Sequence, residues 1–135
     1  MVCDDNIIYT QKSLAQRYGI TISALQQWYP YAGIVKPKKR GGYFDLDAVQ
    51  TADFFYVATK IRRLTRDEYL ERVIPSGGLD EFMRQTNGLS LYDFLTKYIS
   101  EDEKQDPIVK SVIKRIERYE THQQSSDPLY KLHLK

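Results

Sequence analysis

The chain has 135 residues, of which 41% are hydrophobic and 28% charged, a balance typical of a globular domain and too apolar for a disordered segment. No apolar run approaches the roughly 20 residues that cross a bilayer, so we expect no membrane association. A single cysteine excludes an internal disulfide, and with only two histidines beside it we expect neither a metal site nor a cofactor.

The net charge of +2 hides an uneven distribution along the chain. Residues 11–66 carry a net charge of +7, whereas residues 67–135 carry −3. A basic first half joined to an acidic second half suggests a module that binds a polyanion, followed by a segment with another use. The alternative is an ordinary fluctuation of charge along the chain. The start of the chain lacks the features of a secretory signal, so we expect a cytoplasmic protein.

Two short helices with a tight turn between them are predicted near the start of the chain. Apolar residues at helical spacing predict a helix over residues 11–18, which Gly19 ends in a left-handed turn. Thr21 then caps a second helix over residues 22–29, and Pro30 is expected to stop it. A separation of about three residues is the length signature of a helix-turn-helix.

The next segment, residues 34–44, is predicted to form a β-hairpin, and we call it the wing segment. Two β-prone pieces, Ile34-Val35 and Tyr43-Phe44, flank a basic stretch that contains Gly41-Gly42. Its cations are Lys36, Lys38, Lys39 and Arg40. Clustered cations can contact phosphates, although hairpin tips are also lysine-rich for solubility and edge protection.

A third helix, capped by Asp45, is predicted to reach about Leu64, because its apolar residues share one face. Residues 65–68 then form a capping box that opens a fourth helix. That helix should end at the Pro-Ser-Gly-Gly of residues 75–78, the clearest boundary in the sequence. We therefore divide the chain into a domain over residues 7–75, a helical region over 79–123 and a tail over 124–135.

The helical region is predicted to contain three helices, over residues 79–86, 91–99 and 107–122, with the acidic run 101–103 as a solvated loop. The last helix carries an apolar stripe of Val109, Val112, Ile113, Ile116 and Tyr119. This stripe suits self-association, or it packs the region onto the preceding helices.

The first two helices and the wing segment resemble the opening of mercury-resistance-regulator (MerR) transcription factors. The resemblance rests on two segments, Tyr9–Trp28 (YTQKSLAQRYGITISALQQW) and Gly41–Val49 (GGYFDLDAV). The first is equally similar to phage excisionases and to the DNA-binding domains of some phage terminase small subunits. The resemblance covers about residues 7–74 and implies a mainly α winged helix-turn-helix, with a small β-hairpin wing, that binds double-stranded DNA.

The predicted second helix has the pattern of a recognition helix. Ala24, Leu25 and Trp28 would be buried, whereas Ser23, Gln26 and Gln27 would point outward. A glutamine side chain can pair with the major-groove edge of adenine. A solvated polar face without a partner would give the same pattern.

The predicted DNA-contacting residues combine this face with nearby cations. They are Lys12, Arg17, Thr21, Ser23, Gln26, Gln27, Lys36, Lys38, Lys39, Arg40 and Tyr43. The resemblance implies a phosphate contact for Tyr43, although Phe44 stands where the family usually has a basic residue. A second basic cluster, Lys60, Arg62, Arg63 and Arg66, has a phosphate role or forms a solvated face.

We therefore predict a sequence-specific protein for double-stranded DNA, a small transcriptional regulator or an excisionase-like factor. It would act as a homodimer, because one winged module gives limited specificity. The alternatives are a terminase-small-subunit-like DNA-packaging protein of higher oligomeric state and a winged-helix adaptor for other proteins. No phosphate loop, nucleophile elbow or HExxH motif is present, so we do not expect an enzyme.

Overall fold

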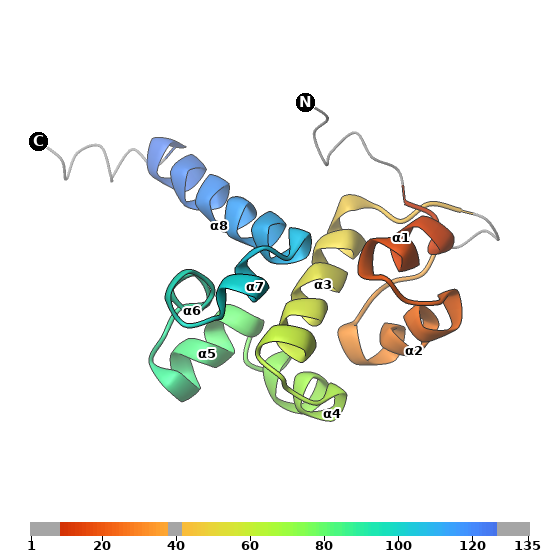
Figure 1. Cartoon of the computed structure of the whole chain (residues 1–135), viewed down its shortest axis with the longest axis horizontal. Helices are drawn as coiled ribbons and strands as arrows, with labels where there is room; N and C mark the ends of the chain where they lie inside the picture. Colours follow the sequence, from red (N-terminus) through yellow and green to blue (C-terminus); the bar gives the residue numbers. More distant parts are fainter. Residues whose placement is uncertain (1–8, 38–41, 127–135) are drawn as a thin grey trace, which may run out of the picture.

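The computed structural model describes residues 9–37 and 42–126, with side chains through Tyr119 (Figure 1). This part of the chain is mainly helical, as predicted. In chain order its elements are α1 (Gln11–Tyr18), α2 (Ile22–Ala32), α3 (Leu46–Tyr56), the π-helical turn η2 (Val57–Ile61), α4 (Arg66–Glu68), a second π-helical turn η3 (Tyr69–Val73), α5 (Leu79–Asn87), α6 (Leu91–Lys97), α7 (Glu101–Lys104) and α8 (Pro107–Ser126).

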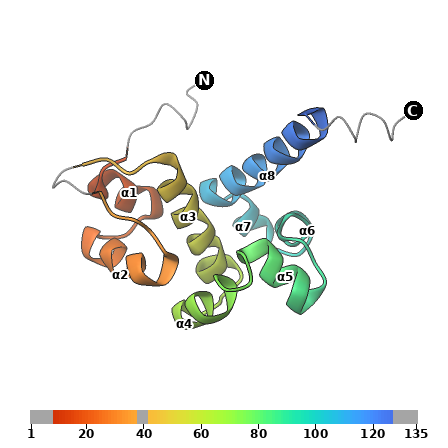
Figure 2. The same ribbon diagram turned by 180° about the vertical axis from the view of Figure 1, so that it is seen from behind.

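Helix α3 lies at the centre of the molecule. The pair α1 and α2 packs on one side of it, and α5, α6 and α8 lie on the other (Figures 1 and 2). One hydrophobic cluster runs through both sides, from Leu14 and Trp28 to Leu95 and Val112. The core is therefore continuous across residues 75–78, where the sequence suggested a boundary.

The predicted helix-turn-helix is present. The Thr10 hydroxyl and the Ser13 side chain form a reciprocal capping box at the start of α1. Gly19 ends that helix with a φ of 69°, in the left-handed region that glycine adopts without strain. Two residues later, the Thr21 hydroxyl accepts the Ala24 amide at 3.0 Å and starts α2.

The predicted end of α2 was wrong, because the helix continues through Pro30 to Ala32. Pro30 lies in the last turn, where its missing N–H removes only one intrahelical hydrogen bond. The helix ends instead at Gly33, with a φ of 72°. The Tyr29 carbonyl accepts the amides of both Gly33 and Ile34, at 3.1 and 3.2 Å, and closes the last turn.

The β-hairpin predicted for the wing segment is not seen in the residues that the structure describes, which exclude 38–41. The amide of Phe44 donates to the Tyr9 carbonyl at 2.8 Å, and these two residues form an isolated antiparallel bridge. Phe44 is buried and its ring lies 6.1 Å from that of Tyr29. The chain before α1 thus supplies the pairing that the prediction assigned to Ile34-Val35.

The third predicted helix was too long, because the α-helical turns end at Tyr56 and η2 ends at Ile61. Arg63 then adopts a φ of 64°, and this left-handed residue turns the chain toward α4. The predicted capping box is confirmed. The Thr65 hydroxyl accepts the Glu68 amide, and the Glu68 carboxylate accepts the Thr65 amide, both at 3.0 Å.

Beyond Gly78 the three predicted helices are present as α5, α6 and α8, with ends that differ by a few residues. The acidic run predicted as a loop forms the short helix α7, because Ser100 and Glu103 make a further capping box. In α8 the predicted stripe is only partly buried. Val109 and Val112 are fully buried, whereas Tyr119 is exposed, and the C-terminal half of α8 points away from the body (Figure 1).

Candidate nucleic-acid interface

The exposed face of α2 carries the polar side chains predicted for a recognition helix. Leu25 and Trp28 are buried against the core, whereas Ser23, Gln26 and Gln27 are exposed. The orientation predicted from helical spacing is therefore confirmed for these residues, whereas Ala24, also predicted to be buried, is only half-buried. Thr21 is also exposed, and its hydroxyl caps the helix.

Neighbouring elements hold the two glutamines by hydrogen bonds. The Gln26 amide donates to the Gln11 side chain on α1 at 2.9 Å, and the Tyr29 hydroxyl donates to the same oxygen at 3.2 Å. On the other side, Arg66 of α4 donates to the Gln27 oxygen at 3.4 Å. Both glutamines thus start from defined positions, which lowers the ordering cost of a contact made by this face.

Exposed cationic side chains are also present on other elements. Lys12 on α1 and Lys36 in the wing segment are exposed, as is the ring of Tyr43. Arg66 brings a further guanidinium beside α2. The predicted contacts of Lys38, Lys39 and Arg40 lie outside the described residues.

Arg17, predicted to contact DNA, is instead engaged inside the molecule. Its Nε and Nη2 atoms donate to the two carboxylate oxygens of Asp53, at 2.9 and 2.8 Å. Only 14% of the side chain is exposed, and Nη1 donates to the Tyr9 hydroxyl at 2.9 Å. We therefore correct this prediction and remove Arg17 from the proposed interface.

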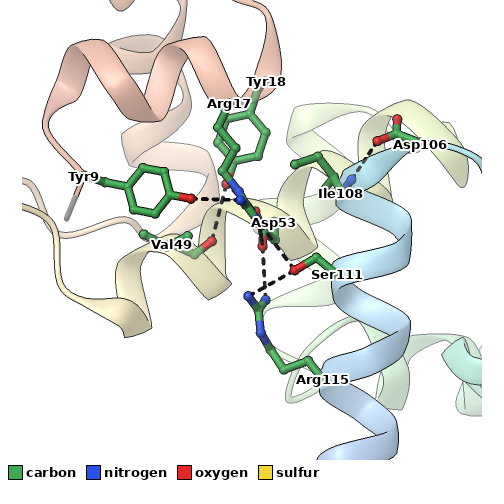
Figure 3. Close-up of polar contacts among 9 residues, drawn as sticks. All are labelled: Tyr9, Arg17, Tyr18, Val49, Asp53, Asp106, Ile108, Ser111 and Arg115. Atoms are coloured by element: carbon green, nitrogen blue, oxygen red, sulfur yellow. Dashed lines mark hydrogen bonds and ion pairs between the residues drawn. The ribbon is translucent and has the colours of Figure 1, made fainter. Parts of the chain in front are cut away.

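Asp53 is the centre of a buried polar cluster, which we call the Asp53 cluster (Figure 3). Its carboxylate accepts hydrogen bonds from Arg17, from the Tyr18 hydroxyl and, at 3.1 Å, from Nη1 of Arg115 on α8. These contacts join α1, α3 and α8. They fix the position of α1, whose Gln11 side chain accepts the hydrogen bond from Gln26 of α2.

The charges of the Asp53 cluster stabilise one another. Burial opposes the charge on Arg17, but the hydrogen bonds and attraction from Asp53 outweigh it and raise the pKa of the guanidinium. Burial, reinforced by the adjacent carboxylate, also raises the pKa of the Tyr18 hydroxyl well above its usual range. Tyr18 therefore remains protonated and acts as a donor to Asp53.

Gln11 and Asp53 were not predicted from the sequence to take part in this region. Asp53 had a usable signal, because it lies between Val49 and Val57 at four-residue spacing, in the middle of a buried stripe. An acid on such a stripe requires a partner. Gln11 had no such signal, because its contact with Gln26 depends on how α1 and α2 pack.

In the part of the chain with described side chains, no group of three or more His, Cys, Asp or Glu residues could hold a metal ion. Within residues 9–37 and 42–126, none of the helices has both the length and the apolar character that a membrane crossing requires. In comparisons with family models, curated proteins and solved structures, none matched this chain. Functional assignment therefore depends on the site itself.

Proposed function

We propose that this protein binds double-stranded DNA in a sequence-specific way through the exposed face of α2, as a small transcriptional regulator or excisionase-like factor. The observation that carries the proposal is the outward face of Ser23, Gln26 and Gln27 on the second helix of a helix-turn-helix. A helix of this kind fits the major groove, where its exposed side chains reach the base edges.

The side chains around α2 suit the two kinds of contact that such a complex needs. Gln26 and Gln27 can each pair with the N6 and N7 atoms of adenine. Lys12, Lys36 and Arg66 can neutralise phosphates on either side of the groove. The wing segment would add its remaining cations to the adjacent backbone.

Pairing of two copies would allow the protein to read an inverted repeat, with half-sites about one helical turn apart. The test is selection of bound fragments from a random duplex pool at about 150 mM salt, a physiological ionic strength. We expect a short motif arranged as an inverted repeat. Failure to retain any fragment would contradict DNA binding, and retention without a motif would contradict sequence reading.

Two substitutions separate base reading from phosphate contact. Gln26→Ala should reduce discrimination at one base pair by about 1–3 kcal/mol, because it removes a base contact. Lys36→Ala should weaken binding to all sequences and lower the salt dependence by about one counterion. Lys97→Ala, at an exposed cation on α6, is the matched control and should change neither. Equal losses on every sequence for both interface variants would contradict these roles.

A further inference from the structure

A pocket of about 430 Å³ opens between α3, α5, α6 and α8. Its walls are mainly apolar and include Phe54, Leu91 and Ile116. Two guanidiniums, Arg84 on α5 and Arg115 on α8, also line the pocket. Small-molecule sites are typically concave, of roughly 300–1,000 Å³, and combine apolar walls with a few polar groups.

The acid that lines this pocket, Asp80, is already neutralised. One of its oxygens accepts the Leu91 amide and the other accepts Nε of Arg84, both at 2.8 Å. In its hydrogen bonds to the rest of the described chain, Arg84 uses only this Nε. Its other N–H groups can therefore donate to a bound molecule.

Arg115 adds a second cation that its surroundings do not fully neutralise. It shares the single carboxylate of Asp53 with Arg17, so the Asp53 cluster sets two guanidiniums against one carboxylate. Arg115 donates to Asp53 at 3.1 Å and to the Ser111 hydroxyl at 3.5 Å. Glu117, the acid nearby on α8, accepts the Tyr92 hydroxyl at 3.0 Å. The pocket therefore combines apolar walls with two guanidiniums, Arg84 and Arg115, that supply N–H donors.

We propose that this pocket binds a small amphipathic organic acid, with its apolar body against Phe54, Leu91 and Ile116 and its carboxylate on Arg84 and Arg115. Hydrogen bonds between guanidinium and carboxylate are charge-assisted and supply the preference for an anion. Arg115 belongs to both the pocket and the Asp53 cluster. A bound carboxylate would therefore contact the Arg115 guanidinium, which connects α8 to Asp53 and, through Asp53, to Arg17 on α1. This site is independent of the proposed DNA binding.

The experiment uses two probes that differ only in the acid group, 4-phenylbutyrate and 4-phenylbutan-1-ol, titrated into the full chain and followed by two-dimensional NMR. We expect the acid to bind about tenfold more tightly than the alcohol, the ratio that one charge-assisted contact of ordinary strength supports. The Arg17 Nε–H signal should shift with the acid. Binding of neither probe, or equal affinity for both, would overturn the proposal.

Three variants locate the binding. Ile116→Trp should fill the pocket and abolish binding of both probes, whereas Arg84→Gln should lower affinity for the acid alone. Lys114→Gln, at an exposed cation on α8 that does not line the pocket, is the matched control and should leave both affinities unchanged. Unchanged acid binding in Arg84→Gln would overturn the proposal. That comparison also decides the outcome if Ile116→Trp fails to fold.

Discussion

Asp53 is fully buried, and both of its carboxylate oxygens accept hydrogen bonds from cationic or hydroxyl donors. A carboxylate loses its hydration when it is buried, and this cost is recovered only if partners satisfy its oxygens. Here Arg17 contacts both oxygens, and Tyr18 and Arg115 add one contact each. The Asp53 carboxylate can therefore stay charged inside the fold, because residues of α1 and α8 supply the hydrogen bonds that replace its hydration.

We expect Asp53→Asn to lower the free energy of unfolding by about 3–5 kcal/mol, because it leaves two largely but not fully buried guanidiniums without a counter-charge. Urea unfolding at neutral pH measures this loss. Asp93→Asn is the matched control, since the Asp93–Lys97 pair is exposed, and it should cost less than about 1 kcal/mol. Similar small losses in both variants would show that the Asp53 cluster does not stabilise the fold.

The buried Tyr69 hydroxyl should make the free energy of unfolding fall at alkaline pH. Its side chain is buried, its ring lies edge-on to Phe55 at 5.0 Å, and burial raises its pKa from 10 to about 12. The hydroxyl ionises near pH 10 in the unfolded chain but remains protonated in the folded chain until about pH 12. Tyr69 therefore makes its full contribution to the free energy of unfolding below pH 10, and this contribution is lost as the pH rises to about 12.

Tyr69→Phe should therefore reduce the alkaline loss of stability by roughly 2–3 kcal/mol, because phenylalanine cannot ionise. The measurement is the free energy of unfolding as a function of pH, compared between variant and parent. Tyr98→Phe, at a ring that is mostly exposed in the folded chain, serves as the control for the loss of a tyrosine hydroxyl. Identical pH profiles for Tyr69→Phe and the parent chain would contradict the expectation.

At the scale of elements, the helices could be predicted because their start signals are local. Thr21, Asp45 and Thr65 each accept the backbone amide three positions further on, in the helix that they were predicted to cap. Such a contact requires only the residues of a single turn. The exposed face of α2 could be predicted for the same reason, since helical spacing alone separates it from Leu25 and Trp28.

The elements that could not be predicted depend on contacts between distant residues. Phe44 pairs with Tyr9, and nothing within the wing segment distinguishes that partner from Ile34-Val35. Arg17 has the sequence surroundings of an exposed helical cation, and only the packing of α3 and α8 brings Asp53 and Arg115 to it. The basic charge of residues 11–66 therefore overstates the cations available at the candidate interface.

At the scale of the whole molecule, α3 connects the helix-turn-helix to the C-terminal helices. Its buried side chains belong to the same hydrophobic cluster as those of α1, α2, α6 and α8. The Asp53 cluster adds a polar connection between α1 and α8 across the same helix. Loss of packing on either side of α3 therefore disturbs a core that both sides share. We expect α1 and α2 to unfold together with α5, α6 and α8.

Leu95→Ala tests this expectation, because Leu95 is fully buried in α6, on the opposite side of α3 from the single tryptophan, Trp28, in α2. Loss of a buried leucine should lower the free energy of unfolding by about 2–5 kcal/mol. In a cooperative molecule, the urea midpoint from Trp28 fluorescence shifts together with the midpoint from far-UV circular dichroism.

Leu70→Ala, at a side chain that is 40% exposed, is the control and should cost less than about 1 kcal/mol. A Trp28 transition that stays in place in Leu95→Ala while the circular dichroism transition moves would show that the two sides of α3 unfold independently. The boundary read from residues 75–78 would then separate two folding units, in spite of their shared core. Coincident shifts would instead mean that α5, α6 and α8 help to hold α2 in place.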